Sequence, residues 1–173
     1  IRADKNLVHP DDQWKKYSSE TTGAVATFFD ARELETASYT SDLISHFSAG
    51  RSNFQKISRP FTPDIIVYCK SNYLFLEAGT GKDRINTQLE QFKQLHGYYP
   101  KVILEQGGGL MIVEENQKCI QTVLEVFTDM MKISFLSEQF GGPHFMSEEQ
   151  ISVIDNWEVE HYRRSVARSQ GKV

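Results

Sequence analysis

The sequence predicts an α/β fold in which a small mixed sheet is covered by helices. Two short runs rich in Val, Ile and Leu, residues 102–105 and 110–113, have the length and composition of buried strands. Gly107, Gly108 and Gly109 separate the two runs and allow the backbone to reverse tightly. Apolar residues then recur at helical spacing from about residue 116. This unit of strand, glycine turn, strand and helix indicates a Rossmann-like three-layer or a two-layer sandwich.

Further strands are expected before this unit. Residues 65–69 and 73–76 are short and apolar, and the three polar residues between them suit a hairpin turn. The segment 60–64 predicts an extended entry into the first of these runs, because Pro60 and Pro63 each restrict the backbone of the residue before them. One more strand is expected from the N-terminal third of the chain.

Helical spacing of apolar residues predicts two long helices, at 83–96 and 116–140. A last helix is predicted from the capping-box pair Ser147 and Gln150. Trp157 lies within the apolar stripe of this last helix, so we expect its side chain to be buried against the rest of the protein.

Length, charge and cysteine content narrow the class of protein. The 173 residues suit one domain over 1–173, with 1–37 as a poorly defined N-terminal segment, and the start at Ile1 without a Met predicts a fragment of a longer chain. A net charge of −4 argues against a nucleic-acid partner, and no apolar run is long enough for a membrane span. Cys69 and Cys119 are expected to be reduced, buried thiols of a cytoplasmic protein.

The candidate ligand-binding residues are Gly107, Gly108 and Gly109, whose amides would cradle an anion. The loop 79–83 is similar to a phosphate loop, but Leu76 stands where a glycine is needed and Asp83 where Ser or Thr is needed. No catalytic residue, metal site or cofactor is predicted, because the histidines lack ligand spacing. The five histidines are His9, His46, His96, His144 and His161.

Three segments together resemble the bacterial class II aldolase/adducin family, including rhamnulose-1-phosphate aldolase/short-chain dehydrogenase proteins. They are 61–68, the pair of runs in 100–113, and 154–160, which is similar to the family's closing EYWxLE-like motif. The resemblance covers roughly residues 38 to 164. It implies a place in carbohydrate metabolism and a position after the catalytic half of the family protein.

The family's functional motifs do not carry over to this chain. Its zinc site uses an HxH pair and a histidine in an NHGL-type turn, whereas this chain has no HxH and its turn 106–110 has no histidine. The dinucleotide fingerprint of the dehydrogenase half is absent as well. The resemblance therefore implies an accessory C-terminal domain that supports assembly or covers the site of a class II aldolase-like lyase.

The expected partner is an upstream aldolase domain or a second copy of the chain, with a sugar phosphate as the ligand. Two other functions stay open from the residues alone. One is a small-molecule or phosphate-binding module that uses the turn at Gly107 to Gly109. The other is an independent enzyme of carbohydrate metabolism whose site the sequence does not reveal.

Overall fold

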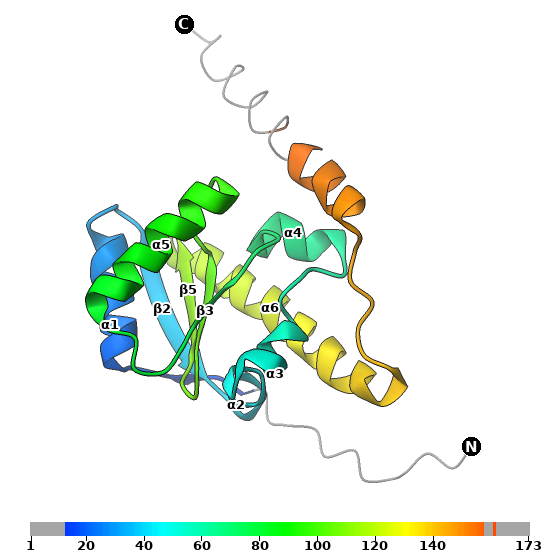
Figure 1. The fold of residues 1–173 in the computed structure, drawn as a ribbon, viewed down its shortest axis with the longest axis horizontal. Helices are drawn as coiled ribbons and strands as arrows, with labels where there is room; N and C mark the ends of the chain where they lie inside the picture. Colours follow the sequence, from blue (N-terminus) through cyan, green and yellow to red (C-terminus); the bar gives the residue numbers. More distant parts are fainter. Residues whose placement is uncertain (1–12, 158–160, 162–173) are drawn as a thin grey trace, which may run out of the picture.

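The structure is a computed structural model that describes residues 13–157 and 161. Its described strands form one sheet in the order β1–β2–β5–β4–β3 (Figure 1). The strands are β1 (Lys15–Lys16), β2 (Glu35–Thr40), β3 (Leu74–Leu76), β4 (Val102–Glu105) and β5 (Leu110–Glu114). β3 and β4 run parallel, while the other neighbouring pairs are antiparallel. The sheet is mixed as predicted, with more antiparallel pairing than a Rossmann fold.

Helices cover both faces of this sheet. They are α1 (Glu20–Asp30), α2 (Asp42–Ser48), α3 (Arg51–Gln55), α4 (Pro63–Cys69), α5 (Lys82–His96) and α6 (Gln117–Ser137), followed by the 3₁₀ turn η1 (Glu138–Phe140) and a helical stretch at 148–157. α1 and α5 pack side by side on one face, and α2, α3, α4 and α6 pack on the other. Within the described part of the chain, no helix is both long and apolar enough to cross a bilayer.

Alternating side chains of the two central strands point into two separate cores. Val102 and Leu104 of β4 pack with α6, whereas Ile103 between them packs with α1 and α5. β5 behaves in the same way, with Ile112 on the α6 side and Met111 on the other. Strands that are buried on both faces need apolar residues at every position. The predicted α/β sandwich is confirmed, with three layers.

The strand predicted at 65–69 is wrong, because these residues belong to helix α4. Thr62 takes the extended conformation of an N-cap and Pro63 occupies the first turn, where its missing N–H costs nothing. Ile65, Ile66 and Cys69 then face the core at helical spacing. The same Thr-Pro-Asp signal that suggested entry into a strand is thus a helix start.

Cys69 lies fully buried between α4 and α6, where its thiol donates to the backbone oxygen of Val123 at 3.8 Å. Burial raises the pKa of Cys69 to about 12, so the group stays a neutral thiol near pH 7. Cys119 is only partly buried, and both cysteines are free. The prediction of a buried thiol is thus confirmed for Cys69 and wrong for Cys119, which keeps part of its surface exposed.

The last helix begins as predicted but does not bury its tryptophan. The Ser147 hydroxyl accepts from the Gln150 amide, and the Gln150 side chain accepts from the Ser147 amide, which is the predicted capping box. Ile151 is buried, whereas Trp157 is 59% exposed. The prediction of a buried Trp157 is therefore wrong: this helix meets the rest of the protein through Ile151 and through Asp155, which accepts a hydrogen bond from Ser71 at 3.0 Å, while Trp157 stays exposed.

Candidate functional site

A cavity of about 820 Å³ lies where three segments far apart in the sequence meet. The first half of α1 forms one side, the loop 79–82 at the start of α5 forms another, and Glu105 closes the end of β4. Residues that end neighbouring strands or begin helices often gather at one edge of an α/β sheet, where ligands bind. The structure therefore brings the phosphate-loop-like segment to the same cavity as Glu105, which precedes the glycine turn.

Glu105 is held by hydroxyl groups from the segment that leads into α1. Its Oε2 atom accepts a hydrogen bond from Ser19 Oγ at 2.9 Å, across 86 positions of sequence. The hydroxyl of Tyr17 belongs to the same cluster, close enough to Ser19 and Glu105 for both to shift its pKa. Burial raises the pKa of Tyr17; the Ser19 hydrogen bond lowers it, and the negative charge of Glu105 raises it further. The cluster fixes the carboxylate at the cavity wall.

The glycine turn packs directly against Tyr17 and Glu105 of this cluster. Gly107 has a φ of 66°, which confirms the predicted need for positive φ in the turn. A Cβ atom on Gly108 would lie 2.6 Å from the Tyr17 hydroxyl oxygen. On Gly109 it would lie 2.5 Å from the Tyr17 ring and 2.7 Å from the backbone oxygen of Tyr39. These two glycines are required because Tyr17 and β2 pack directly against the turn.

Two amides of the turn already have partners within the protein. The Gly107 N–H donates to the Ser48 carbonyl at 2.8 Å, and the Gly108 N–H donates to the Glu105 carbonyl at 2.9 Å. The cavity wall includes Glu105 but none of Gly107, Gly108 and Gly109. Ligand binding by these glycines stays a prediction, and their observed role is to position Glu105.

Gln106 connects the glycine turn to the loop across the cavity. Its side-chain oxygen accepts from the Ala78 amide at 3.1 Å, and its own amide donates to the Leu76 carbonyl at 2.8 Å. α5 begins just after this loop, with Gly81 as an N-cap that offers no side-chain acceptor. The positive end of the helix and the exposed Lys82 therefore face the cavity opposite Glu105. Such an arrangement suits a small polar ligand with a negative group at one end.

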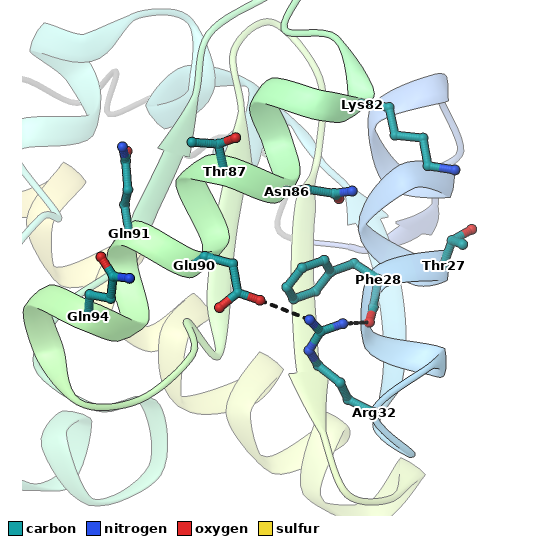
Figure 2. A pocket seen from close by; sticks show the side chains of 9 residues that line it. All are labelled: Thr27, Phe28, Arg32, Lys82, Asn86, Thr87, Glu90, Gln91 and Gln94. Carbon is teal, nitrogen blue, oxygen red and sulfur yellow. Dashed lines mark hydrogen bonds and ion pairs between the residues drawn. The ribbon is translucent and has the colours of Figure 1, made fainter.

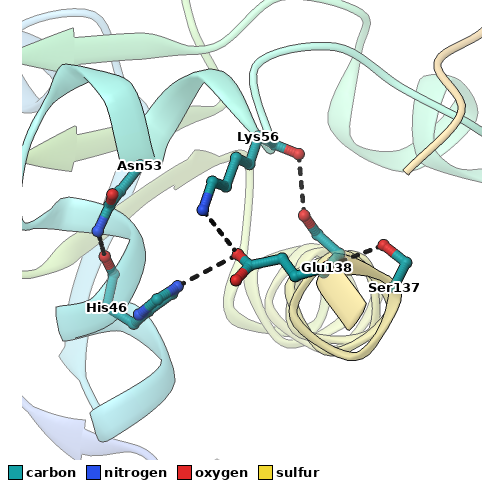
Figure 3. A network of polar contacts seen from close by, with 6 residues as sticks. His46, Asn53, Lys56, Ser137 and Glu138 are labelled. Atoms are coloured by element: carbon teal, nitrogen blue, oxygen red, sulfur yellow. Dashed lines mark hydrogen bonds and ion pairs between the residues drawn. The ribbon is translucent and has the colours of Figure 1, made fainter. Parts of the chain in front are cut away.

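His46 has a structural partner elsewhere in the molecule (Figure 3). Its Nε2 atom lies 3.4 Å from Glu138 Oε1, and Lys56 Nζ donates to the same oxygen at 3.1 Å. Burial acts to raise the pKa of Glu138, but the hydrogen bonds and positive charges of Lys56 and His46 outweigh it and hold that pKa below its usual range. This network joins α2 and α3 to the end of α6.

The other described histidines do not come together to form a metal site. His96 packs against Phe92, and burial lowers its pKa; His144 is exposed; His161 packs against Trp157. His9 lies outside the described residues. Over residues 13–157 and 161, no three His, Cys, Asp or Glu side chains come close enough to hold a metal ion. The described donor set therefore does not fit the zinc of the class II aldolase family.

The cluster of Tyr17, Ser19 and Glu105 was not foreseen from the sequence. Tyr17 and Ser19 lie in the segment that sequence reasoning left undefined, and only the fold brings them to Glu105. One local signal was available, because Glu105 is a carboxylate at the end of a buried strand and directly before a glycine turn.

Two solved structures share this fold. YgbL from Escherichia coli, proposed to be an aldolase, epimerase or decarboxylase, matches with a TM-score of 0.58 and 14% identity over 78% of this chain and 64% of YgbL. YgbL from Klebsiella pneumoniae matches with a TM-score of 0.53 and 14% identity over 76% of this chain and 64% of that protein. No protein-family model and no curated protein matches the sequence. The chain spans less than two thirds of either neighbour, and the likeness shows that it shares their fold.

Proposed function

We propose that this chain is an accessory, non-catalytic part of a class II aldolase-like protein, and that it forms one wall of that protein's small-molecule site. The observation that carries the proposal is the cavity at the end of β4. There Glu105 is fixed by Ser19 on one side, while Lys82 and the start of α5 lie on the other. Convergent polar groups around a cavity at a strand end are typical of ligand sites in α/β proteins.

Two observations favour an accessory role over an independent enzyme. The described residues do not bring metal ligands together, and class II aldol chemistry needs a metal to stabilise the enediolate. The likeness to YgbL also covers 64% of the YgbL chain. We therefore infer that the metal ligands, which the described residues of this chain do not supply, come from an upstream aldolase region or from a second copy of this chain.

The isolated chain is expected not to cleave or condense sugar phosphates. The assay uses the purified chain with zinc or manganese and a panel of ketose 1-phosphates, and the matched control is the same chain joined to its upstream region. We expect metal-dependent turnover only in the control. Turnover by the isolated chain that is lost in His144→Ala would contradict the accessory role and favour an independent enzyme.

A second candidate function is a small-molecule or phosphate-binding module that acts without further domains. The exposed Lys82 beside the uncapped start of α5 favours it, since both stabilise a negative group. Glu105 limits the ligand, because its carboxylate would repel a phosphate placed next to it. Calorimetric titration of the isolated chain with a ketose 1-phosphate separates the two functions, because only the module binds it without the upstream region.

A further inference from the structure

A second cavity, of about 660 Å³, follows the groove between α1 and α5 (Figure 2). It shares Thr27 and Lys82 with the cavity at Glu105 but extends away from it along α5. Uncharged polar side chains dominate its wall. They are Thr27 of α1 and Asn86, Thr87, Gln91 and Gln94 of α5. Carboxamides and hydroxyls each offer hydrogen-bond donors as well as acceptors.

The opposite charges inside this groove neutralise each other. Arg32 Nη2 lies 2.8 Å from Glu90 Oε1, and the Tyr99 hydroxyl donates to the same carboxylate at 3.0 Å. The Arg32 guanidinium also covers the Phe28 ring at 3.6 Å from its centre. The groove therefore offers neither an unpaired charge in its middle nor an open aromatic face, and its free hydrogen-bonding capacity lies in the amides (Figure 2).

Asn86 carries the strongest indication of a ligand. Its Oδ1 atom is shielded from solvent, yet it accepts no hydrogen bond from any described residue. A buried polar atom without a partner is costly, and most such atoms in folded proteins are satisfied. No hydrogen bond to a described residue has to break for this oxygen to turn towards the groove, since Oδ1 has none.

We propose that the groove between α1 and α5 binds a small uncharged polyol, one hydroxyl of which donates to Asn86 Oδ1. The remaining hydroxyls of such a ligand match Thr87, Gln91 and Gln94 along the exposed side of α5. An anion is disfavoured in the middle of the groove, where Arg32 is already paired with Glu90; the other cation of the lining, Lys82, stands at the end that the groove shares with the cavity at Glu105. An apolar ligand is disfavoured because the Phe28 ring is covered. This site is separate from the proposed function of the cavity at Glu105.

The test is an NMR titration of the chain with glucitol, a neutral hexitol, read from the side-chain amide signals of Asn86, Gln91 and Gln94. Polyols also stabilise proteins without binding, by exclusion from the surface, so a residue-specific and saturable shift is required. We expect such shifts in the parent chain and about tenfold weaker binding in Asn86→Ala and Asn86→Leu, as for one lost hydrogen bond. Gln88→Ala is the matched control, because Gln88 lies on the same helix but lines neither cavity.

The melting temperature provides a second readout. Neither Asn86 variant should melt below the parent, because the lost oxygen has no partner among the described residues. A clear fall in both variants would show a purely structural role and overturn the proposal. Shifts that grow linearly without saturation, equal binding by the Asn86 variants and the parent, or the same shifts with inorganic phosphate would overturn it as well.

Discussion

Gly109→Ala is expected to lower the free energy of unfolding by about 3 kcal/mol, the upper end of the usual cost of overpacking. The added methyl group would lie 2.5 Å from the Tyr17 ring and 2.7 Å from the backbone oxygen of Tyr39. The ring can shift, but the oxygen belongs to β2, which pairs with β5 directly beside the turn. Urea unfolding followed by circular dichroism measures the change.

Gly23→Ala is the matched control, because it makes the same chemical change in the middle of helix α1. Nothing lies within 4 Å of a Cβ atom at Gly23. Alanine should therefore raise the free energy of unfolding by about 0.5–1 kcal/mol, through its higher helix propensity. Equal effects of the two substitutions would contradict the close packing of Tyr17 and β2 against the turn.

Phe127→Ala is expected to cost about 3–5 kcal/mol of stability, as other large core truncations do. Phe127 of α6 is fully buried, and its ring meets Tyr73 edge to face at 5.0 Å between centres. It lies in the core that joins α6 to the sheet, so its loss leaves a cavity there. Thermal and urea unfolding of the variant measure the cost.

Trp157→Ala is the comparison for this result. The exposed position of Trp157 predicts a change within about 0.5 kcal/mol, typical of surface substitutions. If Trp157→Ala costs as much as Phe127→Ala, the last helix docks against the protein as the sequence predicts, and its observed placement is wrong.

The central unit of the fold could be predicted because its physics is local. The strands at β4 and β5 are buried on both faces, so their apolar runs are continuous and short. The turn between them needs glycine for two reasons, positive φ at Gly107 and close packing at Gly108 and Gly109. The apolar spacing of α5 and α6 follows from one buried face for each helix.

The wrong predictions concern segments whose apolar pattern fits two structures, or whose structure depends on contacts with residues distant in the sequence. A short apolar run such as 65–69 fits a strand or a buried helix equally well by periodicity, and the proline signal decides it. The strand expected in the N-terminal third could not be placed from the sequence, because Glu35–Thr40 (β2) has few apolar residues and its pairing with β5 is a tertiary effect. Trp157 fits an apolar stripe, but only the path of the helix determines whether that stripe meets a partner.

The candidate site was predictable only in part. The glycine turn and the loop 79–83 were each recognised as unusual, and the structure places the loop in the wall of the cavity at Glu105, the residue two positions before the first glycine of the turn. The carboxylate that the turn positions, Glu105, was not singled out. Its partners Tyr17 and Ser19 are more than 80 residues away in sequence, so local patterns do not reveal their contact.

Hydrogen–deuterium exchange of the chain joined to the proposed upstream aldolase region, with and without a non-cleavable ketose 1-phosphate analogue, tests the proposed role most directly. We expect slower exchange on ligand binding at residues 79–82 and at Glu105, which line the cavity, and in the turn 106–109 that follows Glu105 directly. The C-terminal half of α6 is the internal control and should not change. Protection confined to the upstream region, with 79–82 and 105–109 unaltered at saturating ligand, would contradict the proposal that this chain forms a wall of the site.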